Sequence, residues 1–212
     1  MRSPSGSRVG GVKGGRVVCG TFEELGPQDC FVTAGNAFGI MTAGIDAAVV
    51  RRFGEGLMRR VQERIMDQYM GEQPVGTAFV VETGDAGIPF VCHAPTMRVP
   101  GSIAGTDKVY VATWAALLAV QAHNQIDERR IETVALPAMG TGFGGVAYSE
   151  AARQMAAAWR HYLEPPHRLD WDTVVDTSGG SMNVHIMDGL MYILSRCAPT
   201  AKVAVNLSWG TF

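Results

Sequence analysis

A chain of 212 residues, 47% of them hydrophobic and 18% charged, can bury a sizeable core and is too apolar to be disordered as a whole. Its formal net charge of −2 excludes the broad basic surface that general nucleic-acid or anionic-membrane binding requires. No apolar run approaches the ~20 residues of a membrane span, so we expect one main globular domain.

The amino terminus and the cysteines bear on where the protein resides. Residues 1–15 are rich in Gly and Ser and carry no apolar secretory run, so we expect a loose tail. The four cysteines form no Cys-x-x-Cys pair, which favours buried reduced thiols over a zinc cluster or a disulfide framework. Both features are typical of a cytoplasmic protein.

The first half of the chain combines short apolar strands with one long helix. Residues 83–87 separate two of the strands, and their Gly and Asp suit a tight turn, so those strands form a hairpin or lie side by side. The pattern predicts strands over 16–19, 30–34, 78–82 and 89–94 and a helix over 45–70.

The second half continues the alternation. Ser149 is the expected N-cap of its last clear helix, and the two prolines at 165–166 end that helix. Alternating strands and helices indicate a mixed or parallel sheet covered on both faces, with ligands bound beyond the carboxyl ends of the strands. The predicted helices are 109–124, 149–163 and 183–197, and the predicted strands are 131–137, 171–175 and 202–207.

The first candidate site is residues 31–46, where an apolar strand leads to Asn36, a loop containing glycine, and Asp46 at a helix start. Such a loop lets a ligand approach backbone N–H groups, and the helix N-terminus favours an anion. The structural alternatives are that Asp46 simply caps the helix and that Asn36 is an ordinary turn residue.

The second candidate site is residues 136–146, where four glycines occupy six positions between a strand and a helix. Without Cβ atoms, successive amides can point at phosphate oxygens. The loop lacks the Gly-Lys-Ser/Thr of a P-loop and only approaches the dinucleotide pattern, so hydride transfer is not expected. A plain flexible turn is the alternative.

Together the two loops resemble the macrodomain family. Thr33-Ala34-Gly35-Asn36 stands at the family's Asn-Ala-Ala-Asn signature, Ile45-Asp46 follows Asn36 with the family's spacing, and 140–144 stands at its Ser-Thr-Gly-aromatic-Gly loop. The segment 91–95 resembles the strand end that carries His in family members. The resemblance implies a three-layer α/β/α fold with a mixed central sheet and an ADP-ribose-binding domain over residues 16–176.

The resemblance also implies roles for the loop residues. Asn36 would hold the distal ribose, Phe143 would pack beside it, and the glycines would hold the diphosphate, while Asp46 with Asn36 would serve hydrolysis of an ADP-ribosyl bond. No metal and no cofactor are implied. The ligand-binding residues would be Asn36, Phe38, Gly39, Gly44, Ile45, Gly140, Thr141, Gly142, Phe143, Gly144 and Gly145.

Three positions differ from the family pattern. Gly20-Thr21 stands where an Asp usually binds adenine, Thr33 replaces the first Asn, and 41–44 replaces a run of glycines. A cyclic or modified ADP-ribose, or a nucleotide other than adenine, is compatible with these changes. His93 has no second metal-binding residue near it in sequence, so we interpret it as a half-buried structural histidine rather than a ligand or base.

Two further resemblances bear on context. The sequence of 94–100 is similar to that of a bacterial and phage-associated macrodomain branch. The segment 177–212 resembles a strand-helix-strand fragment of subtilisin-like serine proteases, without a complete catalytic triad. The extension is either a piece of a macrodomain-protease fusion or a generic addition. Three functions follow: a hydrolase that releases ADP-ribose from a macromolecular or small-molecule conjugate, a non-catalytic nucleotide sensor for an attached domain, or a phage-derived structural protein.

Overall fold

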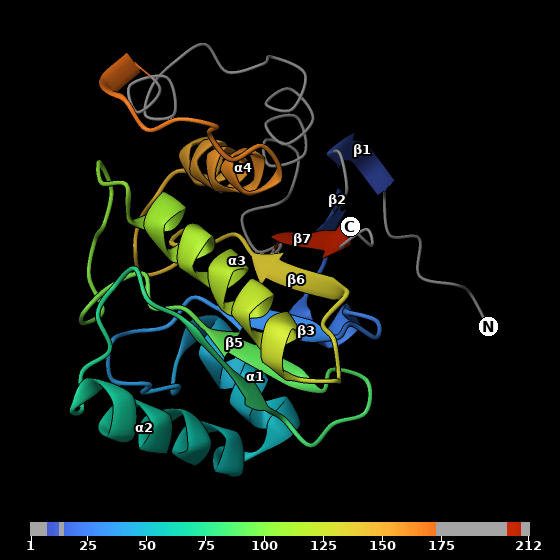
Figure 1. Cartoon of the computed structure of the whole chain (residues 1–212). Coiled ribbons are helices and arrows are strands. Elements are labelled where there is room, and N and C mark those ends of the chain that lie inside the picture. The colour runs from blue at the N-terminus through green and yellow to red at the C-terminus, as the bar shows by residue number, and fades with distance from the viewer. Residues whose placement is uncertain (1–7, 13–14, 173–202, 209–212) are drawn as a thin grey trace.

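The computed structural model describes residues 8–12, 15–172 and 203–208, which build one mixed sheet with helices on both faces (Figure 1). The seven strands lie in the order β1-β2-β7-β6-β3-β5-β4. The strands are β1 (Arg8–Val12), β2 (Gly15–Cys19), β3 (Cys30–Thr33), β4 (Phe79–Glu82), β5 (Phe90–His93), β6 (Thr133–Pro137) and β7 (Val203–Ser208). The helices are η1 (Phe22–Glu24), α1 (Gly44–Phe53), α2 (Glu55–Tyr69), α3 (Lys108–Ile126) and α4 (Tyr148–Leu163).

The centre of the sheet is parallel and its flanks are antiparallel. β3 pairs in parallel with both β5 and β6, whereas β4 runs antiparallel to β5 and β7 antiparallel to β6. The carboxyl ends of β6, β3 and β5 therefore share one edge of the sheet. Loops that follow these three strands meet there, which is where α/β proteins place ligands.

Alternation along the central strands divides the core into two halves. Cys30 and Val32 pack toward α3 and α4, while the intervening Phe31 packs toward α1 and α2. This follows from the period of two in a strand, because a strand buried on both faces needs apolar side chains on both. The predicted three-layer α/β/α architecture is confirmed, and Figure 1 shows the two helix pairs on opposite sides of the sheet.

Two local expectations were wrong. The single helix expected over 45–70 is two helices, because Gly54 adopts φ 82° and closes α1 before α2 begins. Ser149 does not cap α4: the N-cap is Ala147, and no side chain supplies a cap hydrogen bond. Both errors concern helix ends, which depend on backbone conformation more than on hydrophobic spacing.

The ends of the chain contribute to the sheet. Residues 8–12, expected within a loose tail, form β1 and pair with β2. The strand expected over 202–207, in the presumed extension, is β7, which lies between β2 and β6. Of the strand expected over 171–175, the described residues 171–172 are helical. The helix expected over 183–197 lies outside the described residues.

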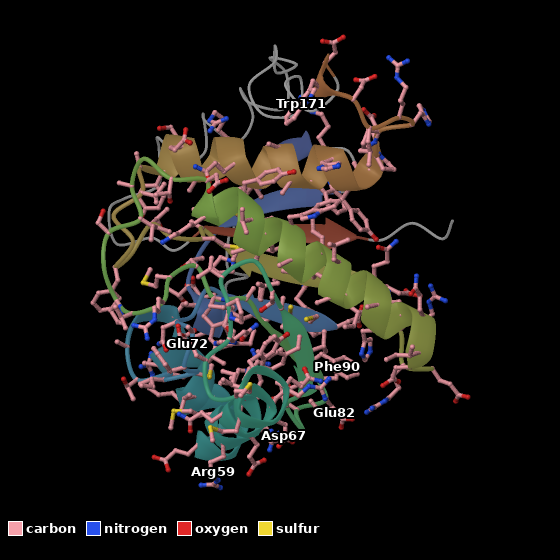
Figure 2. All side chains as sticks on the ribbon, turned by 60° about the vertical axis from the view of Figure 1, so that its left-hand side comes forward. Arg59, Asp67, Glu72, Glu82, Phe90 and Trp171 are labelled. Carbon is pink, nitrogen blue, oxygen red and sulfur yellow. The ribbon has the colours of Figure 1, made fainter. Side chains whose placement is uncertain are left out.

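Three labelled side chains illustrate the surface away from the sheet edge. Figure 2 shows Arg59 and Asp67 on α2, and Trp171, which is 81% exposed, beyond α4. Within the described part of the chain, no helix is long and apolar enough to cross a membrane.

Candidate functional site

A cavity of about 480 Å³ opens at the carboxyl edge of the three parallel strands. Its walls come from the segments that follow β3, β5 and β6, so the two predicted loops face each other across it. The lining residues are Ala34, Gly35, Asn36, Phe38, Ile40, Thr42, Ala43, Gly44, Ile45, Asp46, Thr96, Met97, Val99, Pro100, Pro137, Ala138, Gly140, Thr141, Gly142, Phe143, Gly144 and Tyr148.

Asn36 is the residue that shapes the first loop. Its Oδ1 accepts hydrogen bonds from the amides of Phe38 at 3.1 Å and Ile40 at 3.3 Å, and its Nδ2 donates to the Ile40 carbonyl at 2.8 Å. These three bonds close a compact turn and leave one amide hydrogen of the side chain for a ligand. Asn36 is therefore first a loop-forming residue, and a ribose contact would add to that role.

Asp46 lies at the start of α1 with its carboxyl group buried in the cavity floor. The N-cap of α1 is Ala43, so Asp46 is the third helical residue and makes no cap bond; the capping alternative is wrong. The residue is 6% exposed, and its Oδ1 has no hydrogen-bond partner. Burial raises the pKa of the Asp46 carboxyl to about 7 because the charged form loses hydration.

Glycines set the shape of the second loop. Gly140 adopts φ 75°, and a Cβ on Gly144 would lie 2.4 Å from the carbonyl oxygen of Gly140, so the loop doubles back with no room for a side chain. Within the described chain, no intramolecular acceptor is recorded for the amides of Gly142, Phe143 and Gly144. These amides can therefore donate to a ligand.

The electrostatic character of the wall is unusual for an anion site. Among the lining residues no Lys or Arg is present, and Asp46 is the one acidic side chain. An anion would have to rely on backbone amides from the second loop and from the first turn of α1, whose N-terminus carries a partial positive charge. Exposed Ile40, Val99 and Phe143 border the cavity.

The structure brings together most of the predicted site. Gly39 and Gly145 do not line the cavity: a Cβ on Gly39 would meet Val61 of α2, and Gly145 turns toward Ser102. The segment after β5, from Thr96 to Pro100, was missed because it carries no glycine-rich signal. Tyr148 was missed because it looked like a helix residue, although helix α4 begins at the cavity wall.

His93 differs from the expected half-buried histidine. It is fully buried, with Nδ1 2.7 Å from Gln73 Oε1, and its Nε2 has no hydrogen-bond partner. Burial lowers the pKa of the His93 imidazole to about 4. In the described ranges, no group of three or more His, Cys, Asp or Glu side chains could hold a metal ion.

Comparison with known proteins identifies the class. The family model of the Macro domain matches residues 32–155, which include both loops and Asp46. This match spans more than half of the chain, and the protein therefore belongs to the Macro domain family.

Relatives extend the match. An uncharacterized protein of Aquifex aeolicus is 34% identical over 147 residues, covering 69% of this chain and 81% of that protein. An uncharacterized protein of Aeropyrum pernix is 35% identical over 142 residues, covering 64% of this chain and 69% of that protein.

Solved structures share the fold at lower identity. A mutant of the Oceanobacillus iheyensis macrodomain with ADPR has a TM-score of 0.57 at 18% identity, covering 80% of this chain and 88% of that chain. The macrodomain of Mycobacterium tuberculosis DarG has a TM-score of 0.55 at 22% identity, covering 74% of this chain and 93% of that chain. The resemblance of 177–212 to a protease fragment finds no support in these comparisons.

Proposed function

We propose that this protein binds ADP-ribose or a closely related NAD-derived nucleotide in the cavity and hydrolyses ADP-ribosyl conjugates with Asp46. The observation that carries the proposal is that two loops a hundred residues apart in sequence form one cavity with unpaired amides and a buried carboxyl group. The cavity volume of about 480 Å³ falls in the range of small-molecule sites.

The amides account for the anionic part of the ligand. A diphosphate between the second loop and the first turn of α1 would accept hydrogen bonds from Gly142, Phe143 and Gly144 on one side and face the helix N-terminus on the other. The Oceanobacillus macrodomain has been solved with ADPR and with ADP, which supports the assignment of this ligand class to the shared fold.

Asp46 accounts for the proposed chemistry. A general base works best when its pKa lies near the working pH, and burial brings the pKa of Asp46 to about 7. The ionised carboxylate would accept a proton from water as that water attacks the distal ribose carbon. The bond from this carbon to the conjugate breaks, and the leaving group takes up the proton held by Asp46. Asn36, with one amide hydrogen left, would orient the ribose rather than act on the bond.

A non-catalytic nucleotide sensor is the second candidate. The three hydrogen bonds that Asn36 makes within its own loop favour the sensor, because a side chain held in this way contributes little to a reacting centre. Cyclic or modified ADP-ribose and ligands with another base remain candidates, since Thr21 replaces the usual adenine-binding Asp and does not line the cavity.

Calorimetry and turnover separate these candidates. Wild-type protein is titrated with ADP-ribose, ADP and ribose 5-phosphate, and Asp46→Asn is tested in parallel on an ADP-ribosylated peptide and an ADP-ribosylated oligonucleotide. The hydrolase proposal predicts binding by both proteins and a loss of turnover of at least about 100-fold in the variant. Binding without turnover in the wild type supports the sensor, and no binding at all contradicts both.

A further inference from the structure

Four buried polar atoms without a hydrogen-bond partner belong to residues at the carboxyl end of β3, at and just after the end of β5, and in the first turn of α1. They belong to Thr33 (Oγ1), Asp46 (Oδ1), His93 (Nε2) and Thr96 (Oγ1). Thr33 lies beside His93 in the register of β3 and β5, and the amide of Thr96 donates to the Gly35 carbonyl at 3.1 Å. Buried polar atoms are normally paired, so unpaired ones on neighbouring segments call for a physical explanation.

Gly35 is what allows Asp46 and His93 to approach each other. A Cβ at this position would lie 2.6 Å from His93 Nε2 and 3.2 Å from Asp46 Oδ2, so a single atom placed there would touch both groups. The family signature carries Ala at this position, whereas this chain has the residue without a side chain. Because Gly35 has no Cβ, Nε2 of His93 and Oδ2 of Asp46 both lie close to its backbone, and the two atoms are no farther apart than the sum of these distances.

Gln73 determines which nitrogen of His93 carries the proton. Its Nε2 donates to the carbonyls of Thr77 at 3.1 Å and His93 at 3.4 Å, which fixes the orientation of the amide. Its Oε1, 2.7 Å from His93 Nδ1, can only accept. Nδ1 of His93 therefore carries the hydrogen, and Nε2 presents a bare lone pair toward Gly35 and Asp46.

A bare nitrogen and a carboxylate are both acceptors, so they face each other favourably only when a proton lies between them. Desolvation favours the neutral form of both groups. It lowers the pKa of the His93 imidazole to about 4 and raises the pKa of the Asp46 carboxyl to about 7, so between these pH values the imidazole is neutral while the carboxyl keeps its proton.

We propose that Asp46 and His93 share one proton beside Gly35, through a buried water. The proton resides on the Asp46 carboxyl group and is donated toward Nε2 of His93; on ionisation it leaves to solvent and the charge stays on Asp46. His93 is thus a positioning residue that sets the protonation of Asp46. A buried water needs two to four polar partners, and the Asp46 carboxyl and His93 Nε2 supply two.

Other titratable groups approach the pair only indirectly. From α2, Tyr69 stacks on Phe79 and Arg64 lies 5.9 Å from the same ring, so Phe79 stands between them and His93. Tyr148 is the other titratable side chain that lines the cavity. A titration seen at His93 can therefore be assigned to Asp46.

The test is made on ligand-free protein, so it does not depend on the proposed enzymatic activity. Two-bond ¹H–¹⁵N spectra of the histidine rings and ¹³C spectra of the Asp carboxyl groups are recorded from pH 5 to 9. We expect His93 to remain the neutral Nδ1–H tautomer, with its Nε2 shift moving at the same midpoint as the Asp46 carboxyl. A protonated Nε2, or an Nε2 shift that ignores the ionisation of Asp46, overturns the proposal.

Variants confirm the assignment. Asp46→Asn should abolish the Nε2 titration, while His123→Gln, at a half-buried site against Phe90, should leave it intact. Gln73→Met removes the acceptor that fixes the tautomer, and the Asp46 midpoint should fall by about one pH unit because His93 no longer offers its lone pair. An unchanged midpoint in folded Gln73→Met protein contradicts the role of His93.

The same variant connects the pair to catalysis. If Asp46 is the base, the acid limb of the pH profile for hydrolysis moves with the shifted midpoint. A midpoint that moves while the hydrolysis profile stays fixed contradicts the proposed function of Asp46 and leaves the proton sharing established.

Discussion

The two loops that form the cavity reach a defined shape by opposite means. The first, 34–43, is tied by a side chain, because Asn36 makes three hydrogen bonds to its own backbone. The second, 138–147, is defined by missing side chains, because Gly140 and Gly144 pack backbone against backbone. The first loop thus uses its polar groups in hydrogen bonds within the loop, whereas the second keeps several amides available for a ligand.

The largest expected effect concerns the buried acid that ends the first loop. Because the pKa of Asp46 is raised from 3.8 to about 7, the folded state holds a proton that the unfolded state has lost between these values. Stability from this group therefore falls as pH rises through that window, by roughly 4 kcal/mol in all. Asp46→Asn removes the dependence.

Urea unfolding of wild type and Asp46→Asn at pH 4.5 and pH 8 measures this difference. Relative to the wild type, the free energy of unfolding of the variant should be a few kcal/mol higher at pH 8 than at pH 4.5. The His93 imidazole has the opposite effect below pH 6.5. Because its pKa is lowered, its contribution to the free energy of unfolding rises from pH 4 to 6.5 in both proteins. An identical pH dependence in the two proteins would show that Asp46 is ionised throughout.

Asn36→Ala tests the loop that is tied by a side chain. Loss of three partly buried hydrogen bonds should destabilise the protein by about 2–4 kcal/mol and weaken ADP-ribose binding, because the amides of the turn lose their acceptor. The matched control is Asn124→Ala, which removes two comparable bonds to Ile131 away from the cavity. Similar destabilisation without loss of binding is expected there, as judged by urea unfolding and calorimetry.

Gly144→Ala tests the loop defined by missing side chains. The new Cβ would strike the Gly140 carbonyl, so we expect about 1–3 kcal/mol of destabilisation and weaker binding. Gly142→Ala is the control, since a Cβ there has nothing within 4 Å and the melting temperature should barely change. Equal melting temperatures for the two variants would mean that the backbone contact at Gly144 relaxes freely.

The smallest effect is expected at the outer side of the first loop. Arg98 lies over the ring of Phe38 and forms a two-pronged ion pair with Glu72, which Figure 2 labels, but the Arg98 side chain is 64% exposed and that of Glu72 42%. Solvent and salt screen such pairs. Glu72→Gln should leave the melting temperature and the ADP-ribose affinity nearly unchanged, and a large loss of either would show that this pair holds the loop in place.

The sequence by itself determined the layers of this protein and the position of the two loops. Strand and helix periods follow from side-chain burial, and glycine spacing marks where backbone must come close, so the central strands, α3 and the segment 140–144 were predictable. The period of two also placed Cys30 and Phe31 on opposite faces of the sheet.

Only the tertiary structure decided the helix break, the strand order and the protonation of the site. The break at Gly54 and the insertion of β7 between β2 and β6 depend on backbone conformation and on pairing between distant segments. The pKa values of Asp46 and His93 depend on burial by residues far away in sequence. Local patterns report what a residue prefers, whereas desolvation and shared protons arise only when separate strands and helices meet.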